Sequence, residues 1–295
     1  MKGFTGFSDS DARMIESLAD RAIELAAHRE RRTLPQTLSG AAIALIEELP
    51  GWRNPSAIRL GGAEMGAQVV TVNAKLEGGE DLRDLAAYLQ NWFDIIAIRT
   101  PSLEKLRQFS ALTSLPVINL RTHSNHPCEV LGDLTYIKKR LGSWNGLHVA
   151  VAGPDANILR SWTEAAQVLD IRVTQVAPRE LHLRGNGYVS ATTDVNSLKT
   201  ADVIITDCWP KTADPALQKA LAKYRIDEPL LSACPQQTLF IPCPPVTRGE
   251  EVTEEAMQNV RYCSVAAKNF LLHAQNAVME RVYQSSSDGR SRARK

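Results

Sequence analysis

The chain has 295 residues, of which 44% are hydrophobic and 23% are charged, with a net charge of +1. Because 34 Lys and Arg residues are matched by 33 Asp and Glu residues, the composition argues against a nucleic-acid-binding surface. No apolar run approaches the roughly 18–20 residues of a membrane span, and the N-terminus lacks the pattern of a secretion signal. The five cysteines have neither paired nor clustered spacing. We therefore expect a cytoplasmic protein with no membrane partner, no nucleic-acid partner, no metal and no cofactor.

The first predicted element is an amphipathic helix that begins after Ser10, with Ile15, Leu18, Ala22 and Leu25 on one face. Short β-rich runs then alternate with helical patterns. The predicted strands are 68–73, 95–99, 117–120, 147–152, 171–176, 203–206 and 239–242. The predicted helices between them include 81–91, 103–112 and 156–169, which are long enough for parallel crossovers. This alternation predicts an α/β protein with doubly wound parallel sheets.

Two such α/β domains are predicted, joined by a helix that ends before Gly142. The first domain is expected over 1–141, together with a C-terminal helix at about 264–284 that packs back on it, because a lone terminal helix cannot bury its apolar face. The second is expected over 142–263. The remaining tail, 285–295, is polar and basic, and we expect it to be disordered.

Polar residues follow the predicted strands at the sheet edge where ligands bind in this fold class. Arg99 follows IIAI, and His126 to Glu129 follow VINL. In the second half, the corresponding positions hold the turn GPDAN (153–157), Asp207, Trp209 and Cys243. Taken singly, each is explained by a turn, a surface ion pair or a buried thiol. Together they predict an anion site in the first half and a site for an amino-bearing molecule in the second.

Five segments carry a family resemblance: IAIRTP (96–101), HPCEVLGDLTYIKKRLGSWNGLHVAVAG (126–153), IITDCW (204–209), IPCPPVTRGEEVT (241–253) and LLHAQNAVM (271–279). In this order they resemble the aspartate/ornithine carbamoyltransferase family over essentially the whole chain. The acceptor segments are closer to the ornithine branch. The resemblance implies two α/β domains with the active site in the cleft between them, and a homotrimer that shares sites across subunit contacts.

The acceptor half keeps the pattern of the ornithine branch. The resemblance places Asn157, Asp207 and Cys243 where ornithine enzymes hold the amino-acid acceptor. A carboxylate and an amide can orient an ammonium-bearing substrate, and a thiol can line the path of its reacting amine. Lys211 stands where the ornithine branch has Ser. It either binds an additional carboxylate on the acceptor or points to solvent.

The donor half departs from the family. The resemblance places Arg99 and His126 where the family polarises the carbamoyl carbonyl in acyl transfer. The family's Ser-Thr-Arg-Thr-Arg loop wraps the phosphate of carbamoyl phosphate. Its place is taken here by Gly51, Trp52, Arg53, Asn54 and Pro55. Only the first Arg of that loop is retained, Pro55 lacks a backbone N–H, and Leu271 replaces an Arg of the closing helix.

Glu129 stands where the family has Gln, and it brings a negative charge to a pocket expected to receive phosphate. Two states are open: ionised and paired with an Arg, or protonated with a raised pKa. Either state penalises a phosphate anion relative to Gln, so we expect carbamoyl phosphate to bind poorly.

Two functions remain open. The first is an enzyme that transfers a carbamoyl or related group from an altered donor site to the amine of an ornithine-like amino acid. The amine would attack the carbamoyl carbon directly, without a covalent enzyme intermediate, and positioning and carbonyl polarisation would supply most of the rate. The second is a catalytically silent homologue that binds an amino acid or a partner subunit.

Overall fold

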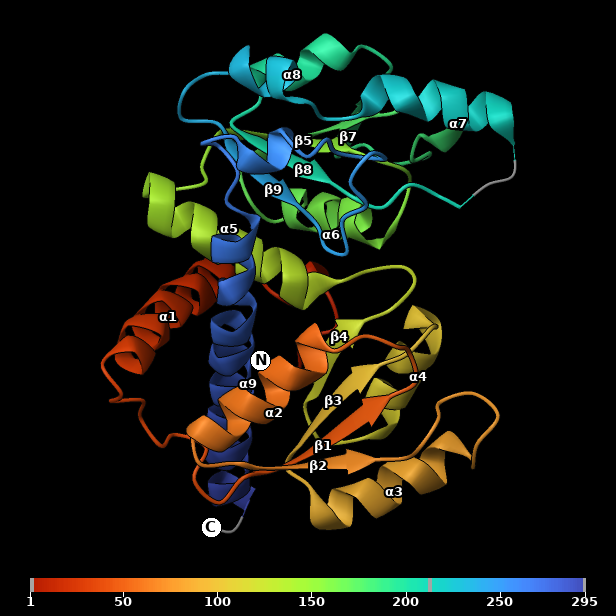
Figure 1. Cartoon of the computed structure of the whole chain (residues 1–295). Helices are drawn as coiled ribbons and strands as arrows, with labels where there is room; N and C mark the ends of the chain where they lie inside the picture. The colour runs from red at the N-terminus through yellow and green to blue at the C-terminus, as the bar shows by residue number, and fades with distance from the viewer. Residues whose placement is uncertain (1–2, 212–213, 294–295) are drawn as a thin grey trace. The chain divides into compact units, whose positions relative to one another are not determined.

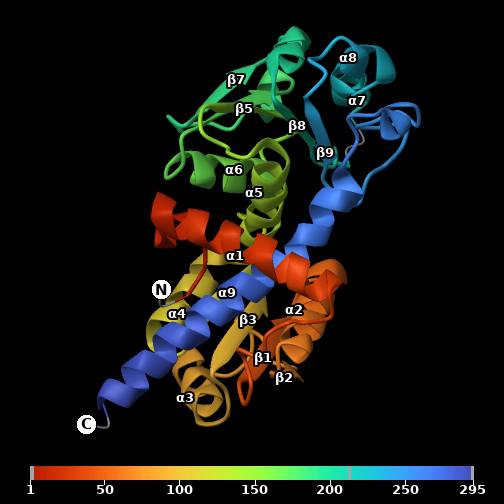
Figure 2. The same ribbon diagram turned by 90° about the vertical axis from the view of Figure 1, so that its left-hand side faces the viewer.

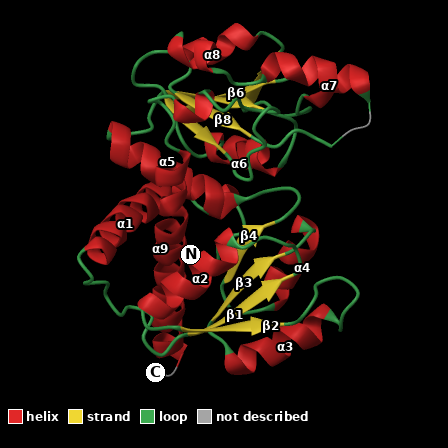
Figure 3. Ribbon diagram, in the orientation of Figure 1, coloured by secondary structure: helices red, strands yellow, loops and turns green. Residues whose placement is uncertain are grey.

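The computed structural model describes residues 3–211 and 214–293. Within these ranges, side chains are described up to residue 286. It divides into two compact units, one formed by Met1–Arg140 with Lys268–Lys295 and the other by Leu141–Ala267. Each unit contains one parallel sheet with helices on its faces, shown in yellow and red in Figure 3. The predicted fold class is therefore confirmed. None of the helices in the described part of the chain is long and apolar enough to cross a membrane.

Unit 1 is built on a four-stranded parallel sheet in the order β2-β1-β3-β4. Its strands are β1 (Ala42–Glu47), β2 (Gln68–Val72), β3 (Ile95–Arg99) and β4 (Val117–Arg121). The helices of this unit are α1 (Ala12–Glu30), α2 (Arg53–Glu64), α3 (Leu82–Trp92), α4 (Leu103–Leu112), α5 (Pro127–Leu141) and most of α9 (Ser264–Ala293). Leu85 and Phe109 pack with Ile98 in one buried cluster, so α3 and α4 cover one face of the sheet.

The opposite face is covered by α2 and α9, and Figures 1 and 2 both show α9 beside α1 and α2. Two glycines allow α9 to approach this closely. A Cβ at Gly61 of α2 would lie 1.9 Å from Asn276 Oδ1, and one at Gly132 of α5 would lie 3.0 Å from the Leu271 Cα. A larger residue at either position would force α9 away from its neighbour.

Unit 2 is built on a five-stranded parallel sheet in the order β7-β6-β5-β8-β9. Its strands are β5 (Leu147–Ala152), β6 (Ile171–Val176), β7 (Val189–Thr192), β8 (Val203–Thr206) and β9 (Leu239–Pro242). Its helices are α6 (Asn157–Ala166), α7 (Pro215–Leu221) and α8 (Glu228–Ser232). Short 3₁₀ helices in the two units are η1 (Phe7–Asp9), η2 (Arg179–Leu181), η3 (Val195–Thr200), η4 (Ala222–Tyr224) and η5 (Ala256–Gln258).

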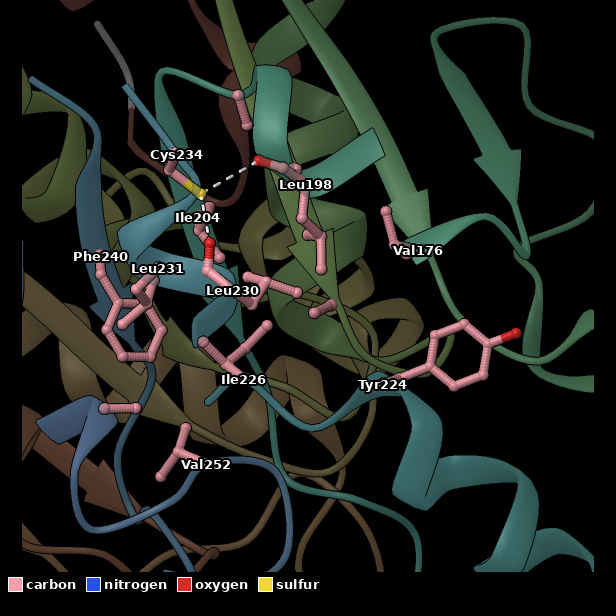
Figure 4. Packing of buried hydrophobic residues seen from close by; sticks show 14 residues of the cluster. Val176, Leu198, Ile204, Tyr224, Ile226, Leu230, Leu231, Cys234, Phe240 and Val252 are labelled. Atoms are coloured by element: carbon pink, nitrogen blue, oxygen red, sulfur yellow. Dashed lines mark hydrogen bonds between the residues drawn. The ribbon is translucent and has the colours of Figure 1, made fainter. Parts of the chain in front are cut away.

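Figure 4 shows the buried hydrophobic cluster in which residues of the strands and helices of unit 2 pack together. Phe240 of β9 and Ile204 of β8 pack there with Leu231 of α8. The thiol of Cys234 lies in the same cluster and donates to the carbonyl oxygen of Leu230 at 3.2 Å. Burial raises the pKa of this thiol, so Cys234 contributes packing rather than reactivity.

Two strands were missed in the sequence, and one of them is central. The run AIALIE forms β1, which lies between β2 and β3. Its Ala, Leu and Glu residues are also typical of a helix, and a short apolar run does not distinguish a strand from a helix. The edge strand β7 is short and largely exposed, so it lacks a hydrophobic pattern.

The C-terminal region also differs from expectation. Helix α9 runs from Ser264 to Ala293, beyond the expected end at about residue 284. The chain is therefore helical over 285–293, where we expected a disordered tail, and 294–295 lie outside the described residues.

Candidate functional site

The carboxyl ends of three neighbouring strands in unit 2 bring the expected acceptor residues together. Ala152 of β5 pairs with Thr206 of β8, which in turn pairs with Pro242 of β9. Asp207 and Cys243 follow this row directly, and the Cys243 backbone N–H donates to the Thr206 carbonyl at 3.0 Å. The sheet therefore places this carboxylate and this thiol on adjacent strand ends.

Gly153, the residue after β5, lies against the backbone of Asp207. A Cβ at Gly153 would lie 3.3 Å from the Asp207 nitrogen, so the close approach depends on glycine. Asn157 begins α6, and its side chain is buried. Lys211 is exposed.

A cavity of about 600 Å³ opens entirely within unit 2, and Asn157, Asp207, Lys211 and Cys243 are not among the residues that line it. Its walls come from the loops after β5, β6 and β8, and they include Ala156 and Cys208, the sequence neighbours of Asn157 and Asp207. Strand order changes direction between β5 and β8, which is where open parallel sheets bind ligands. The cavity has the size of a small-molecule site. Its wall carries charges of both signs, because Arg160 and Arg184 line it together with Asp155 and Glu180, and Arg160 is paired with Asp155 at 2.7 Å.

In unit 1, Arg99 ends β3 and is only 5% exposed. Its Nε donates to the Leu49 carbonyl at 3.1 Å, and its Nη2 donates to the Pro50 carbonyl. Burial lowers the pKa of Arg99, and the nearby charge of Arg121 lowers it further. The side chain nevertheless remains a guanidinium at neutral pH.

The donor-loop residue Gly51 covers this guanidinium. Its φ of +139° is a conformation that favours glycine, and a Cβ there would lie 2.4 Å from Arg99 Nη2. The next residue, Trp52, is 69% exposed. The guanidinium carbon of Arg53 lies 5.0 Å from the centre of the Trp52 ring. Arg53 is thus held at the surface by an aromatic side chain.

Asn54, in contrast, is directed into the interior of unit 1 and is only 2% exposed. Its amide nitrogen donates to Glu129 Oε2 at 3.4 Å, and its Oδ1 accepts from Gln275 Nε2 at 2.7 Å. Both functions of this side chain are therefore engaged within the protein. The loop position where the family presents a hydroxyl group holds a residue that joins α2 to α5 and α9.

Glu129 is 4% exposed, and its partner is a lysine rather than an arginine. Lys268 Nζ lies 3.0 Å from Glu129 Oε1 and 2.7 Å from Asp133 Oδ2. Burial is the largest effect and acts to raise the pKa of Glu129, but Lys268, His126 and Asn54 together hold the pKa below its usual value. Glu129 is therefore the ionised member of a buried ion pair. The expectation of an arginine partner was wrong, and so was the alternative of a raised pKa.

Lys268 and Asp133 were missed in the sequence, although a signal was present. Glu129 and Asp133 are spaced i, i+4 on a helix that is otherwise almost wholly buried, so both face the same neighbour. Two buried carboxylates on one helix face require a cation nearby. The sequence does not show that this cation comes from α9.

His126 is buried, and its Nε2 lies 3.9 Å from Glu129 Oε2. Burial lowers the pKa of His126 to about 4, although the carboxylate of Glu129 opposes the shift. The imidazole is therefore neutral at pH 7, so it is suited to hydrogen-bond donation rather than to charge pairing.

We expect NMR titration of His126 to give a midpoint near pH 4, the His126→Asn spectrum identifying its resonance. Glu129→Gln should lower the midpoint further, because it removes an anion that favours the imidazolium. A midpoint above pH 6, or an upward shift in the variant, would contradict the neutral imidazole.

Comparison with known proteins gives two family models that together span most of the chain. The model described as "Aspartate/ornithine carbamoyltransferase, carbamoyl-P binding domain" matches residues 2–139. The model described as "Aspartate/ornithine carbamoyltransferase, Asp/Orn binding domain" matches residues 145–282. The two matched ranges correspond closely to the main segments of the two compact units.

Individual relatives are similar over the same range. The chain is 28% identical to the ornithine carbamoyltransferase of Methanoculleus marisnigri, with 95% of this chain and 96% of the relative covered. It is 31% identical to that of Azoarcus sp., with 81% of each covered. The crystal structure of ornithine carbamoyltransferase from Burkholderia thailandensis is 26% identical, covers 96% of this chain and 99% of its own, and has a TM-score of 0.89. The enzyme from Thermus thermophilus, 24% identical, covers 96% and 99% and shares the fold with a TM-score of 0.87.

Proposed function

Because this chain belongs to the aspartate/ornithine carbamoyltransferase family, we propose that it transfers a carbamoyl or related group to the amine of an ornithine-like amino acid. The observation that carries this proposal is that Asp207 and Cys243 follow paired strands at one sheet edge, where Cys208, the neighbour of Asp207, lines a cavity of small-molecule size. Asn157 at the start of α6 completes the acceptor site. The carboxylate of Asp207 orients an ammonium group, and Cys243 lines the path of the attacking amine.

The donor site would hold the carbonyl through Arg99 and His126. Two nitrogens of Arg99 are fixed by the loop carbonyls of Leu49 and Pro50, which leaves Nη1 to polarise the carbamoyl oxygen. The neutral His126 donates a second hydrogen bond as negative charge develops on that oxygen. The amine then forms the new C–N bond and loses a proton, and the bond to the leaving group breaks. Positioning of the two substrates supplies much of the rate.

The proposed donor is less anionic than carbamoyl phosphate. Asn54 is engaged with Glu129 and Gln275 rather than open to a ligand, and Glu129 is ionised. Arg53 is the cation of the donor loop that remains near the surface. A small acyl or amidino donor with a weakly charged leaving group fits this arrangement better than a phosphate does.

Glu129→Gln should tighten the binding of carbamoyl phosphate at least tenfold, or about 1.4 kcal/mol. At about 6 Å, a carboxylate and one phosphate charge repel by roughly 3 kcal/mol with an effective dielectric constant near 20. Lys268 lies between the carboxylates and remains paired with Asp133 in the variant. Its positive charge offsets part of the repulsion, so the expected gain is smaller than the full repulsion. Isothermal titration calorimetry measures the change.

The control for bulk charge is Glu77→Gln, an exposed position on unit 1, which should leave the affinity unchanged. Tight binding of carbamoyl phosphate by the native protein would refute the altered donor site, as would a Glu129→Gln variant that binds no better.

A second candidate function is a catalytically silent homologue that binds an amino acid or a partner subunit. The internal contacts of Asn54 with Glu129 and Gln275, and of Lys268 with Asp133, favour it, because these side chains are already engaged within the protein. Ornithine binding without product formation, in both the native protein and Glu129→Gln and with every donor supplied, would support this function over the enzyme.

Lys211 should favour an acceptor that carries more negative charge than ornithine, because its exposed side chain follows the acceptor motif. The comparison is between ornithine and its Nα-acylated derivative with a free carboxylate on the acyl group. Lys211→Ser should reverse or abolish the preference. An unchanged ranking would show that Lys211 is a solvated surface charge.

We also propose a homotrimer in the cytoplasm, as the family resemblance implies. On unit 1, Trp52 at the N-cap of α2, Leu60 of α2 and Val70 of the edge strand β2 expose apolar surface, which supports burial by a second subunit. The odd number of cysteines, five without paired spacing, supports a reducing compartment.

A further inference from the structure

Lys268 is the cation at the centre of a buried cluster in unit 1. Its side chain is 9% exposed. Three carboxylate oxygens lie within 3.0 Å of its Nζ: Glu129 Oε1 at 3.0 Å, Asp133 Oδ1 at 2.8 Å and Asp133 Oδ2 at 2.7 Å. The ammonium group donates hydrogen bonds to both Asp133 oxygens, and Glu129 Oε1 forms an ion pair with it. A ligand anion that binds Lys268 must therefore compete with two carboxylates already paired with it.

The cluster contains one more carboxylate than it needs for neutrality. Glu129 is ionised, whereas burial raises the pKa of Asp133 to about 6. Two carboxylates on one lysine therefore make the cluster neutral or negative near pH 7. For an approaching phosphate, this arrangement cancels the attraction that Lys268 alone would exert.

The same carboxylate links Lys268 to the donor site. Glu129 Oε2 lies 3.4 Å from the amide nitrogen of Asn54 and 3.9 Å from His126 Nε2. Lys268 is thus separated from the donor loop by one side chain. It also lies three residues before Leu271, on the helix where the resemblance expects an arginine, and residues at this spacing are neighbours on a helix surface.

We propose that Lys268 is a specificity-determining residue of the donor site: a cation able to hold a phosphate group, which Glu129 and Asp133 occupy in its place. The cluster thereby selects a donor without a phosphate. This inference rests on the proposed function for the identity of the donor site, but not for the behaviour of the ammonium group.

The test removes the two carboxylate charges and then the cation. Glu129→Gln/Asp133→Asn keeps the shape of both side chains and releases the ammonium group. Affinities for carbamoyl phosphate and for inorganic phosphate are measured by calorimetry, with thermal unfolding as the check on folding. The double variant should bind phosphate at least a hundredfold more tightly than the native protein. Adding Lys268→Gln should return the affinity to within a few-fold of native.

A triple variant that binds as tightly as the double variant would overturn the proposal, because Lys268 would then only hold the helices together. A double variant with no gain would overturn it as well. If the double variant does not fold, Glu129→Gln and Glu129→Gln/Lys268→Gln provide the comparison, and the tenfold gain of the first must disappear in the second. Absence of turnover with ornithine in every variant would count against the proposed function alone, since the phosphate titrations decide the role of Lys268.

Discussion

Lys268→Met should lower the free energy of unfolding by about 3–5 kcal/mol, a large part of the roughly 5–15 kcal/mol of a typical domain. Glu129 and Asp133 are both nearly fully buried and share this one cation. Without it, each must either remain charged in a poorly solvated interior or take up a proton at a cost. Urea denaturation of the purified variant measures the loss.

The matched control is Lys138→Met. Lys138 also contacts two carboxylates, Glu16 at 3.3 Å and Asp20 at 2.6 Å, but both of these are more than half exposed. Exposed ion pairs contribute about 0–1 kcal/mol, so this variant should unfold almost as the native protein does. Adding Glu129→Gln/Asp133→Asn to Lys268→Met should restore most of the lost stability. Equal losses at positions 138 and 268 would contradict a buried, poorly solvated cluster.

Asp207→Asn should weaken the binding of ornithine by about 1.5–3 kcal/mol, the contribution of a hydrogen bond to a charged group. The change keeps the size of the side chain and removes only the charge that meets the ammonium group. Asp207 follows β8 on the row that also sets Cys243, so the backbone of the site should be unaffected. Calorimetric titration with ornithine and with lysine measures the effect.

Asp170→Asn serves as the control, because Asp170 is exposed on the same unit and precedes β6 at the opposite end of the strands. It should leave ornithine affinity unchanged. An Asp207→Asn variant that binds every basic amino acid as tightly as the native protein would remove Asp207 from the acceptor site.

The acceptor half was accessible to sequence reasoning because its residues follow β-rich runs directly. Parallel strands end on a common edge, so placing the strands over 203–206 and 239–242 also places Asp207 and Cys243. The failure to predict β1 did not affect this reasoning, since β1 belongs to the other unit. A residue that follows a strand directly must lie at the edge of the sheet, so its place in the structure can be inferred from the sequence.

The donor half was less accessible because its decisive contacts join distant segments. Asn54 meets Gln275 across 221 sequence positions, and Lys268 meets Asp133 across 135. No local pattern specifies which cation reaches Glu129, nor that the carbonyls of Leu49 and Pro50 hold Arg99. Substitution by Glu at position 129 was visible in the sequence, but its electrostatic meaning depended on a lysine from the far end of the chain.

The return of α9 to unit 1 also sets an order of assembly during synthesis. Unit 2 is a continuous segment, whereas unit 1 lacks the helix that packs on α2 and the counter-ion of Glu129 until residues after 267 have left the ribosome. Domains generally fold as units during synthesis. Unit 1 is therefore the first unit to be synthesised and the last to be completed. Until α9 is made, Glu129 and Asp133 lack Lys268 as their counter-ion.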